Sequence, residues 1–251
     1  MGPPPGKDPP HIHVGEWQHD QHSHWRICEG CAARDDGLHS YNEDNICTVC
    51  GRNFDISHLC PRDHTCPMSA FTDLDKARWY HDGVHYCIDK GLMNGMGNNL
   101  FEPDTNLTRA MVVVLLYRME GSPAVSGSCP FQDVDPARWY YSAIVWATQN
   151  GIANGMSATE FAPDASVTRE QTATFLYRYA NMIGRDVTGR ADVALFPDAD
   201  KISAYAMNAL SWAVDAGMIT GSLDNGVTYL APKGTTTRAQ YATIAYRFLE
   251  K

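Results

Sequence analysis

Three short motifs decide the fold of this chain: Leu107-Thr108-Arg109-Ala110, Val167-Thr168-Arg169-Glu170 and Thr236-Thr237-Arg238-Ala239. In each motif a Thr, which is a favoured residue for capping a helix N-terminus, is followed at once by an Arg. Thr108 and Thr168 are 60 residues apart, and Thr168 and Thr237 are 69 residues apart. Recurrence at such a period indicates that the chain is built from tandem repeats.

The residues around the three motifs repeat as well, in the same order. Each repeat opens with an aromatic residue and an acid, continues with an aromatic position and a glycine, and reaches an aromatic residue and a proline before the Thr-Arg motif. In repeat order, the aligned residues are Phe71, Phe131 and Phe196; Asp73, Asp133 and Asp198; Trp79, Trp139 and Tyr205; Gly95, Gly155 and Gly221; Phe101, Phe161 and Tyr229; Pro103, Pro163 and Pro232.

Each repeat has the pattern of a helix, a loop and a second helix. Apolar residues three and four positions apart mark one face of the first helix, and Cys87 falls on that face where the other repeats have Ala147 and Ala213. The second helix begins at the Thr, and Gln171 and Gln240 complete capping boxes in repeats two and three. We therefore predict a mainly α fold in which three helix–loop–helix repeats form one pseudo-threefold bundle, with repeats at 71–128, 129–192 and 193–251.

The position of the three arginines requires an explanation. The first turn of a helix is the positive end of its dipole, where a cation is disfavoured and an anion is welcome. A carboxylate should therefore compensate each Arg, and it comes either from Asp73, Asp133 and Asp198 or from a ligand. Capped helix N-termini beside glycine-bearing loops and surface aromatic residues also predict a polar groove with free backbone donors.

Together, these motifs resemble the S-layer homology domain of bacterial surface proteins, over about residues 71–251. The resemblance implies a pseudo-threefold bundle whose grooves between repeats bind secondary cell-wall polymers. It also implies that the arginines contact an acidic sugar substituent such as a pyruvate ketal. The chain departs from the family where Glu is usual, at Met111, Gln171 and Gln240, and repeat three lacks the Trp. We rank Arg109 and Arg169 above Arg238 for that reason.

The resemblance and the repeat alignment give one set of candidate ligand-binding residues. They are Arg109, Arg169, Arg238, Asp73, Asp133, Asp198, Trp79, Trp139, Gly95, Gly155 and Gly221. The expected function is non-covalent anchoring to an acidic, pyruvylated-type wall polysaccharide. The alternative is a structural or protein–protein interaction module whose glycan grooves are vestigial.

The first seventy residues differ in composition, since they hold eight of the ten histidines and six of the eight cysteines. We expect a proline-rich leader at 1–16, a Cys/His module at 17–57 and a linker at 58–70. Two Cys-x-x-Cys pairs predict a structural zinc site, and two disulfides are the alternative. The candidate zinc ligands are Cys28, Cys31, Cys47 and Cys50, and His24 and His39 are alternative ligands. Cys60 and Cys66 are a candidate disulfide. The module also resembles, more loosely, small zinc-ribbon-like Cys/His modules beside S-layer homology repeats.

Composition and motifs exclude several function classes. A net charge of −9 argues against nucleic acid and anionic membranes as partners, and no apolar run has the length of a membrane span. Gly-x-Ser-x-Gly, His-Glu-x-x-His and phosphate-loop motifs are missing, so we expect a binding module and not an enzyme. We expect a monomer on the outside of the cell. Because no signal peptide is visible, we expect a processed fragment or part of a larger surface protein.

Overall fold

The computed structural model describes strand residues 18–19, 23–27 and 34–38, and residues 66–76, 78–224 and 227–250. The chain divides into two units, Met1–Asp55 and Ile56–Lys251. In the first unit, β1 (Gln18–His19), β2 (Ser23–Ile27) and β3 (Arg34–Leu38) form an antiparallel sheet in that order. The predicted zinc ligands Cys28, Cys31, Cys47 and Cys50, and His39, lie outside the described residues. His24 lies in β2, where only the backbone is described.

The second unit contains the repeats, and each repeat has the expected pair of helices. The pairs are α1 (His81–Asp89) with α2 (Arg109–Met119), α3 (Tyr141–Gln149) with α4 (Arg169–Met182), and α5 (Met207–Asp215) with α6 (Arg238–Leu249). Short 3-10 turns are η1 (Pro67–Ala70), η2 (Val193–Leu195), η3 (Ala199–Lys201) and η4 (Ala204–Ala206). A hairpin of β4 (Ser222–Asp224) and β5 (Val227–Tyr229) lengthens repeat three. The mainly α prediction is confirmed.

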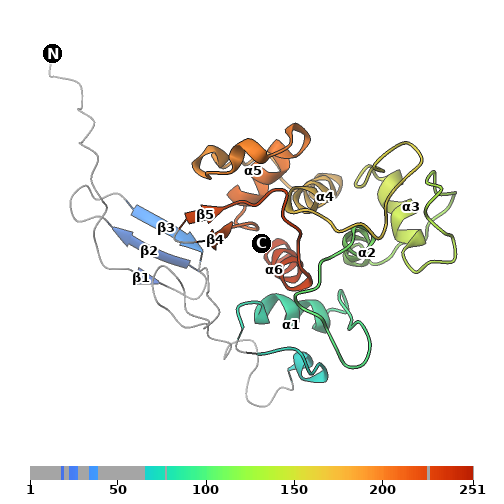
Figure 1. Ribbon diagram of the computed structural model, residues 1–251, viewed down its shortest axis with the longest axis horizontal. Helices are drawn as coiled ribbons and strands as arrows, with labels where there is room; N and C mark the ends of the chain where they lie inside the picture. Colours follow the sequence, from blue (N-terminus) through green and yellow to red (C-terminus); the bar gives the residue numbers. More distant parts are fainter. Residues whose placement is uncertain are drawn as a thin grey trace. The chain divides into compact units, whose positions relative to one another are not determined.

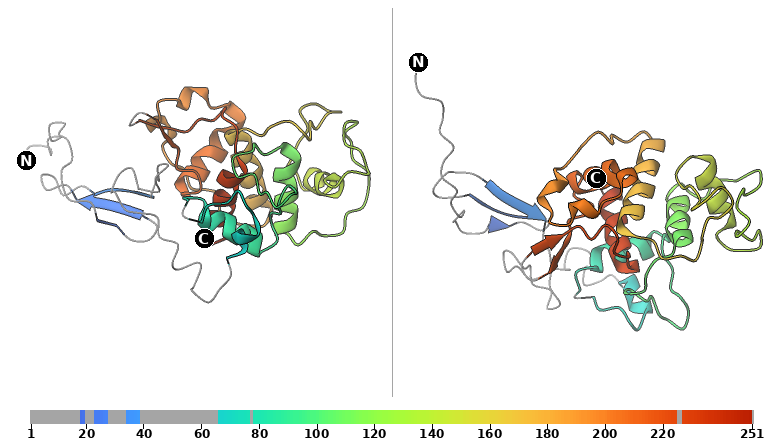
Figure 2. Two further views of the ribbon diagram at one scale, coloured as in Figure 1. Left: turned by 60° about the horizontal axis from the view of Figure 1, so that its bottom comes forward. Right: turned by 45° about the horizontal axis from the view of Figure 1, so that its top comes forward.

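The helices of neighbouring repeats exchange partners around the unit. The first helix of each repeat packs on the second helix of the preceding repeat: α3 on α2, α5 on α4, and α1 on α6. The helices α2, α4 and α6 lie side by side in the middle, and α1, α3 and α5 lie outside them (Figure 1). Figure 2 shows the same arrangement from two further directions. The contact of α1 with α6 joins the beginning of the repeats to their end.

A ring of backbone hydrogen bonds joins the three repeats directly before the central helices. The amide of Leu107 donates to the Thr236 carbonyl at 2.9 Å, Val167 donates to Leu107 at 2.9 Å, and Thr236 donates to Val167 at 3.1 Å. All three residues are fully buried. Because each repeat both donates to one neighbour and accepts from the other, the ring has threefold pseudosymmetry. The predicted pseudo-threefold bundle is therefore confirmed.

The central helices begin where the Thr-Arg motifs place them. The hydroxyl oxygens of Thr108, Thr168 and Thr237 accept from the third helical amide, and the last two form complete capping boxes. The outer helix α1 approaches α6 so closely that a Cβ on Gly83 would lie 2.6 Å from the Thr243 backbone. Cys87 is fully buried at this contact, and burial raises the pKa of its thiol to about 12.

Candidate functional site

Each of the three arginines reaches from its own repeat into the following one. Arg109 donates from Nε to the Phe161 carbonyl and from Nη2 to the Asn154 carbonyl, both at 2.9 Å. Arg238 makes the same pair of contacts in repeat one, with the carbonyls of Phe101 and Asn94 at 2.7 Å. These arginines therefore join repeat one to repeat two and repeat three to repeat one.

Arg169 differs from the other two arginines in how many donors it uses. Its Nε donates to the Leu230 carbonyl at 2.8 Å, and its Nη atoms make no hydrogen bond within the described residues. The exposed fractions of Arg109, Arg169 and Arg238 are 4%, 7% and 5%. Burial lowers the pKa of each guanidinium, but arginine stays protonated because its ordinary pKa is so high.

The aspartates of the repeats bind backbone amides and not the arginines. The two carboxylate oxygens of Asp133 accept from the amides of Phe161 and Ala162 at 2.8 and 2.7 Å. Asp73 and Asp198 make the equivalent pairs of bonds. Among the described residues no direct ion pair joins the arginines to these aspartates, so the predicted Arg–Asp bridge is not formed. Burial has the larger effect on the pKa of Arg109, Arg169 and Arg238 and lowers it, but the charges of Asp133, Asp198 and Asp73 act to raise it, so the aspartates still compensate the arginines at longer range. The amides of the loop need acceptors, and the carboxylate supplies two at once.

Arg and Asp thus hold the same loop residue from its two sides. Phe161 receives Arg109 on its carbonyl and Asp133 on its amide. The next residue, Ala162, has a φ of 57°, in the left-handed region that costs an L-residue about 1–2 kcal/mol. In repeat three the residue held in this way is Leu230, so the alignment of Tyr229 with the aromatic residues was wrong by one position.

The helix N-termini that bear the arginines have no spare backbone donors in their first three positions. In α2 the amide of Arg109 donates to Ala165 at 2.9 Å, that of Ala110 to Pro163 at 3.0 Å, and that of Met111 to the Thr108 hydroxyl at 3.3 Å. The helices α4 and α6 use their amides in the same way. The expectation that these amides are available to a ligand is therefore wrong, and the remaining donors are those of the guanidinium groups.

The predicted glycines lie in the loops for reasons of packing. A Cβ on Gly95 would lie 2.4 Å from the Phe71 ring, and one on Gly155 would lie 2.4 Å from the Phe131 ring. A Cβ on Gly221 would meet the Thr228 side chain at 2.6 Å. In repeats one and two, only glycine fits where the loop crosses the aromatic residue that opens the repeat; in repeat three the Phe196 ring is 3.3 Å from the added Cβ and the φ of 82° also favours glycine.

The aromatic position after the aspartate lies at the surface in repeats two and three. Trp139 is 58% exposed and Tyr205, its counterpart in repeat three, is 55% exposed, whereas Trp79 is half-buried. The ring of Trp139 packs edge-on against Tyr140 at a centroid distance of 5.3 Å. An exposed ring that is held at its edge offers a flat apolar face to a ligand.

Glu170 is a residue of this region that the motif analysis did not single out. It is 3% exposed, and its carboxylate accepts from the Ser203 amide, the hydroxyls of Ser203 and Tyr205 at 3.0 Å, and Lys233 Nζ at 2.6 Å. Burial acts to raise its pKa, but the bonds from Lys233, Ser203 and Tyr205 outweigh burial and lower it. The signal was in the sequence: the other repeats have Ala110 and Ala239 at this position, and acids where repeat three has Lys233.

Three buried side chains at the start of repeat one could hold a metal ion. Cys66, His81 and His85 place their ligand atoms within 4.8 Å of one another. Cys66 is a free thiol, so the candidate disulfide with Cys60 is not formed; its sulfur faces the two histidines instead. Cys60 itself lies outside the described residues, and Cys87 and Cys129 are free as well.

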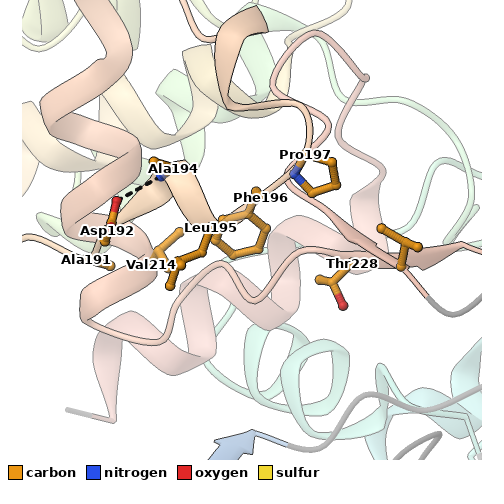
Figure 3. Close-up of a pocket in the computed structure, with 9 residues that line it drawn as sticks. Ala191, Asp192, Ala194, Leu195, Phe196, Pro197, Val214 and Thr228 are labelled. Atoms are coloured by element: carbon orange, nitrogen blue, oxygen red, sulfur yellow. Dashed lines mark hydrogen bonds between the residues drawn. The ribbon is translucent and has the colours of Figure 1, made fainter. Parts of the chain in front are cut away.

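An open apolar hollow of about 600 Å³ lies in repeat three (Figure 3). Leu195, Phe196 and Val214 contribute its apolar wall, and the Asp192 carboxylate accepts from the Ala194 amide at its edge. None of the predicted ligand-binding residues lines it. The candidate site thus remains at the boundaries between repeats.

Comparison with known proteins gives matches over the repeats. The family model of the S-layer homology domain matches residues 70–110, 130–173 and 195–242, which together make up more than half of the chain. The surface-layer 125 kDa protein of Lysinibacillus sphaericus is 34% identical over 179 residues, which cover 71% of this chain and 15% of that protein.

Two other relatives have different names and match similar shares of this chain. The amylopullulanase of Thermoanaerobacterium thermosulfurigenes is 30% identical over 72% of this chain and 10% of that protein. The cellulosome-anchoring protein of Acetivibrio thermocellus is 26% identical over 63% of this chain and 35% of that protein. This chain therefore matches only a minor part of each relative. Since the three family matches coincide with the three helix–loop–helix repeats, the chain belongs to the S-layer homology domain family.

Proposed function

We propose that this chain is a non-covalent anchoring module that binds an acidic, pyruvylated-type cell-wall polysaccharide at the boundaries between its repeats. It acts at the cell surface, as a monomer and without catalysis. The names of relatives support anchoring, since they include a surface-layer protein and a cellulosome-anchoring protein. Among the residues that the structure describes, none of the helices has the length and apolar character that crossing a bilayer requires.

The observation that carries this proposal is the set of arginines at the repeat boundaries. A guanidinium has five N–H donors, and Arg109 and Arg238 each use two of them on backbone carbonyls of the following repeat. No further hydrogen bond joins either group to the described residues. A carboxylate substituent of a sugar can take two of the remaining donors as a bidentate, charge-assisted pair.

The three boundaries are not equivalent, and the internal acid Glu170 explains why. Between repeats two and three, the Glu170 carboxylate already lies against Lys233, Ser203 and Tyr205. By the threefold relation, Ala110 takes the place of Glu170, and Trp139 takes the place of Tyr205. That boundary therefore has an alanine and an exposed ring at the positions where the other boundary has the protein's own acid and Tyr205.

The structural contrast changes the order in which we rank the arginines. Arg109 and Arg238 share the same contacts and are followed in the sequence by Ala110 and Ala239, whereas Arg169 is followed by Glu170. Burial has the larger effect on the pKa of the Arg109 guanidinium and lowers it, while the hydroxyl of Tyr205, which binds Glu170, also acts on Arg109 and raises that pKa. We infer that the glycan binds at Arg109 and Arg238, and that the boundary at Arg169 contributes little. This replaces the ranking from motif completeness, which placed Arg238 last.

A second candidate function is a structural or protein–protein interaction module whose grooves bind no glycan. One observation favours it: the arginines and the first amides of their helices all have partners within the protein. The two proposals differ in what they predict for a purified glycan. The alternative predicts no saturable binding, and the anchoring proposal predicts binding that requires the acidic substituent.

The experiment is a calorimetric titration of the chain with purified, pyruvylated wall polysaccharide. The same polysaccharide after removal of its ketal is the ligand control. The anchoring proposal predicts saturable binding of the first and weak or no binding of the second. Equal binding of both, or of neither, would contradict it.

For the N-terminal unit, we propose a structural zinc ion bound by Cys28, Cys31, Cys47 and Cys50. Four cysteines in two Cys-x-x-Cys pairs are the ligand set of many structural zinc sites, and a unit this small has little core of its own. Zinc content should fall by one equivalent when Cys28 and Cys47 are both replaced by Ser. Four oxidised thiols in the purified chain would favour the disulfide alternative instead.

A further inference from the structure

We propose that Cys66, His81 and His85 form a second structural zinc site, which ties the chain segment before repeat one to its first helix. The Cys66 Sγ lies 3.6 Å from His81 Nε2 and 3.5 Å from His85 Nδ1. The exposed fractions of the three residues are 4%, 0% and 8%. Their donors therefore converge on one interior point and not on the solvent.

The distances agree with those of a tetrahedral zinc ion. With a Zn–S bond of about 2.3 Å, a Zn–N bond of about 2.0–2.1 Å and a tetrahedral angle, sulfur and nitrogen lie about 3.6 Å apart. Both measured separations from the Cys66 sulfur match this value. The two sulfur–nitrogen separations therefore agree with a zinc site, and all three ligand atoms lie within 4.8 Å of one another.

The local structure explains how the three residues meet. His81 and His85 are four residues apart in α1 and so lie on one face of the helix. Cys66 directly precedes η1, which packs on α1. The Asp82 carboxylate lies 3.4 Å from Nδ1 of His81, the ring nitrogen that does not face Cys66. A carboxylate on the far nitrogen is a common second partner of histidines that bind metals, because it fixes the ring orientation and tautomer.

The three donors are specific to repeat one, although the scaffold is common to the repeats. The corresponding residues are Ser126, Tyr141 and Val145 in repeat two, and Ala191, Met207 and Ser211 in repeat three. In repeat three the Ser211 hydroxyl donates to the Ala191 carbonyl, so the preceding segment contacts the same position of the helix. Repeat one therefore places zinc-binding residues at a contact that elsewhere has ordinary side chains.

Zinc suits this set of donors better than other ions do. One thiolate and two imidazoles are typical zinc ligands, whereas calcium and magnesium prefer oxygen. The site is buried, and it leaves a fourth position for water or another protein group. Since metal binding is coupled to folding, the ion should stabilise the entry of the chain into the repeats.

The test is the zinc content of the full chain, purified without added zinc, in a Cys28→Ser/Cys47→Ser background that lacks the first proposed site. We expect one equivalent of zinc in that background, and none after His85→Ala or Cys66→Ser. Cys129→Ser, which removes a free thiol elsewhere in the same unit, should retain the equivalent.

A second measurement needs no substitution in the proposed site, so it remains informative if the Cys66 and His85 variants fail to fold. In the intact background chain, Cys66 should resist alkylation until a chelator is added, while Cys129 should react at the same rate with and without chelator. Cobalt should replace zinc and give the visible bands of a tetrahedral, thiolate-bound ion. A chain that holds no metal in this background, or a Cys66 whose alkylation does not depend on chelator, would leave an ordinary thiol–imidazole contact and overturn the proposal.

Discussion

Replacing Asp133 tests whether its carboxylate, by accepting from the loop amides, fixes the loop of repeat two that Arg109 of repeat one contacts. Its two oxygens accept from Phe161 and Ala162 at 2.8 and 2.7 Å. Asp133 is exposed, so water competes for its bonds, and Asp133→Ala should lower the free energy of unfolding by about 1.5–3 kcal/mol, the value of one hydrogen bond to a charged group. Ala162, with its φ of 57°, also loses the bond that holds it in the left-handed region.

The assay is urea unfolding followed by circular dichroism, with Asp164→Ala as the matched control. Asp164 is an exposed acid in the same loop, so its replacement should change the free energy by no more than about 0.5 kcal/mol. Asp133→Asn keeps one acceptor and should lose about half as much stability as Asp133→Ala. A loss below about 1 kcal/mol for Asp133→Ala would refute the reasoning, because the loop would then be held by other contacts.

Three further predictions concern stability and thiol reactivity. Tyr241 is fully buried, and its hydroxyl has no hydrogen-bond partner among the described residues. Tyr241→Phe should therefore raise the free energy of unfolding, measured with guanidinium chloride, by about 1 kcal/mol. A lower free energy of unfolding for the variant would contradict this. The folded-state pKa of Glu170 is lowered, so its contribution is present above its ordinary pKa of 4.5 and is lost as pH falls through the lowered value. Glu170→Gln should therefore flatten the pH dependence of stability below about pH 4.5. If the melting temperatures of the variant and the parent depend on pH in the same way across that range, the prediction is contradicted. Cys87, with a pKa of about 12 and no exposed surface, should stay unlabelled in the native chain at neutral pH while half-buried Cys129 is alkylated; mass spectrometry of the labelled peptides would detect the reverse order.

The sequence was sufficient to predict the repeats, the starts of the central helices and the threefold arrangement. These features depend on local signals, such as the Thr caps and the apolar faces, which are present in every repeat. The capping boxes at Thr168 and Thr237 are where Gln171 and Gln240 predicted them. Because the sequence contains three repeats, one chain can close the ring of backbone hydrogen bonds among Leu107, Val167 and Thr236.

The partners of the polar groups could not be predicted from the same signals. The motif placed Arg109 at a helix start, but it did not indicate that the side chain would cross to carbonyls 45 and 52 residues away. Likewise, the sequence gave no sign that the first amides of α2 would donate to Ala165 and Pro163 of the next repeat. Such contacts depend on how the repeats close on one another, which a local pattern does not contain.

The central claim is that the arginines at two repeat boundaries bind the acidic glycan. The most direct measurement is calorimetric titration of Arg109→Lys/Arg238→Lys with pyruvylated wall polysaccharide, at a temperature where each variant is folded. Arg118→Lys is the matched control, because Arg118 also donates to a backbone carbonyl, that of Leu92, at 2.8 Å. Loss of one bidentate pair corresponds to about 1.5–3 kcal/mol, so affinity should fall about tenfold or more, while Arg118→Lys and Arg169→Lys stay close to the parent. A double variant that binds as tightly as the parent would contradict the account and leave these arginines with a structural role alone.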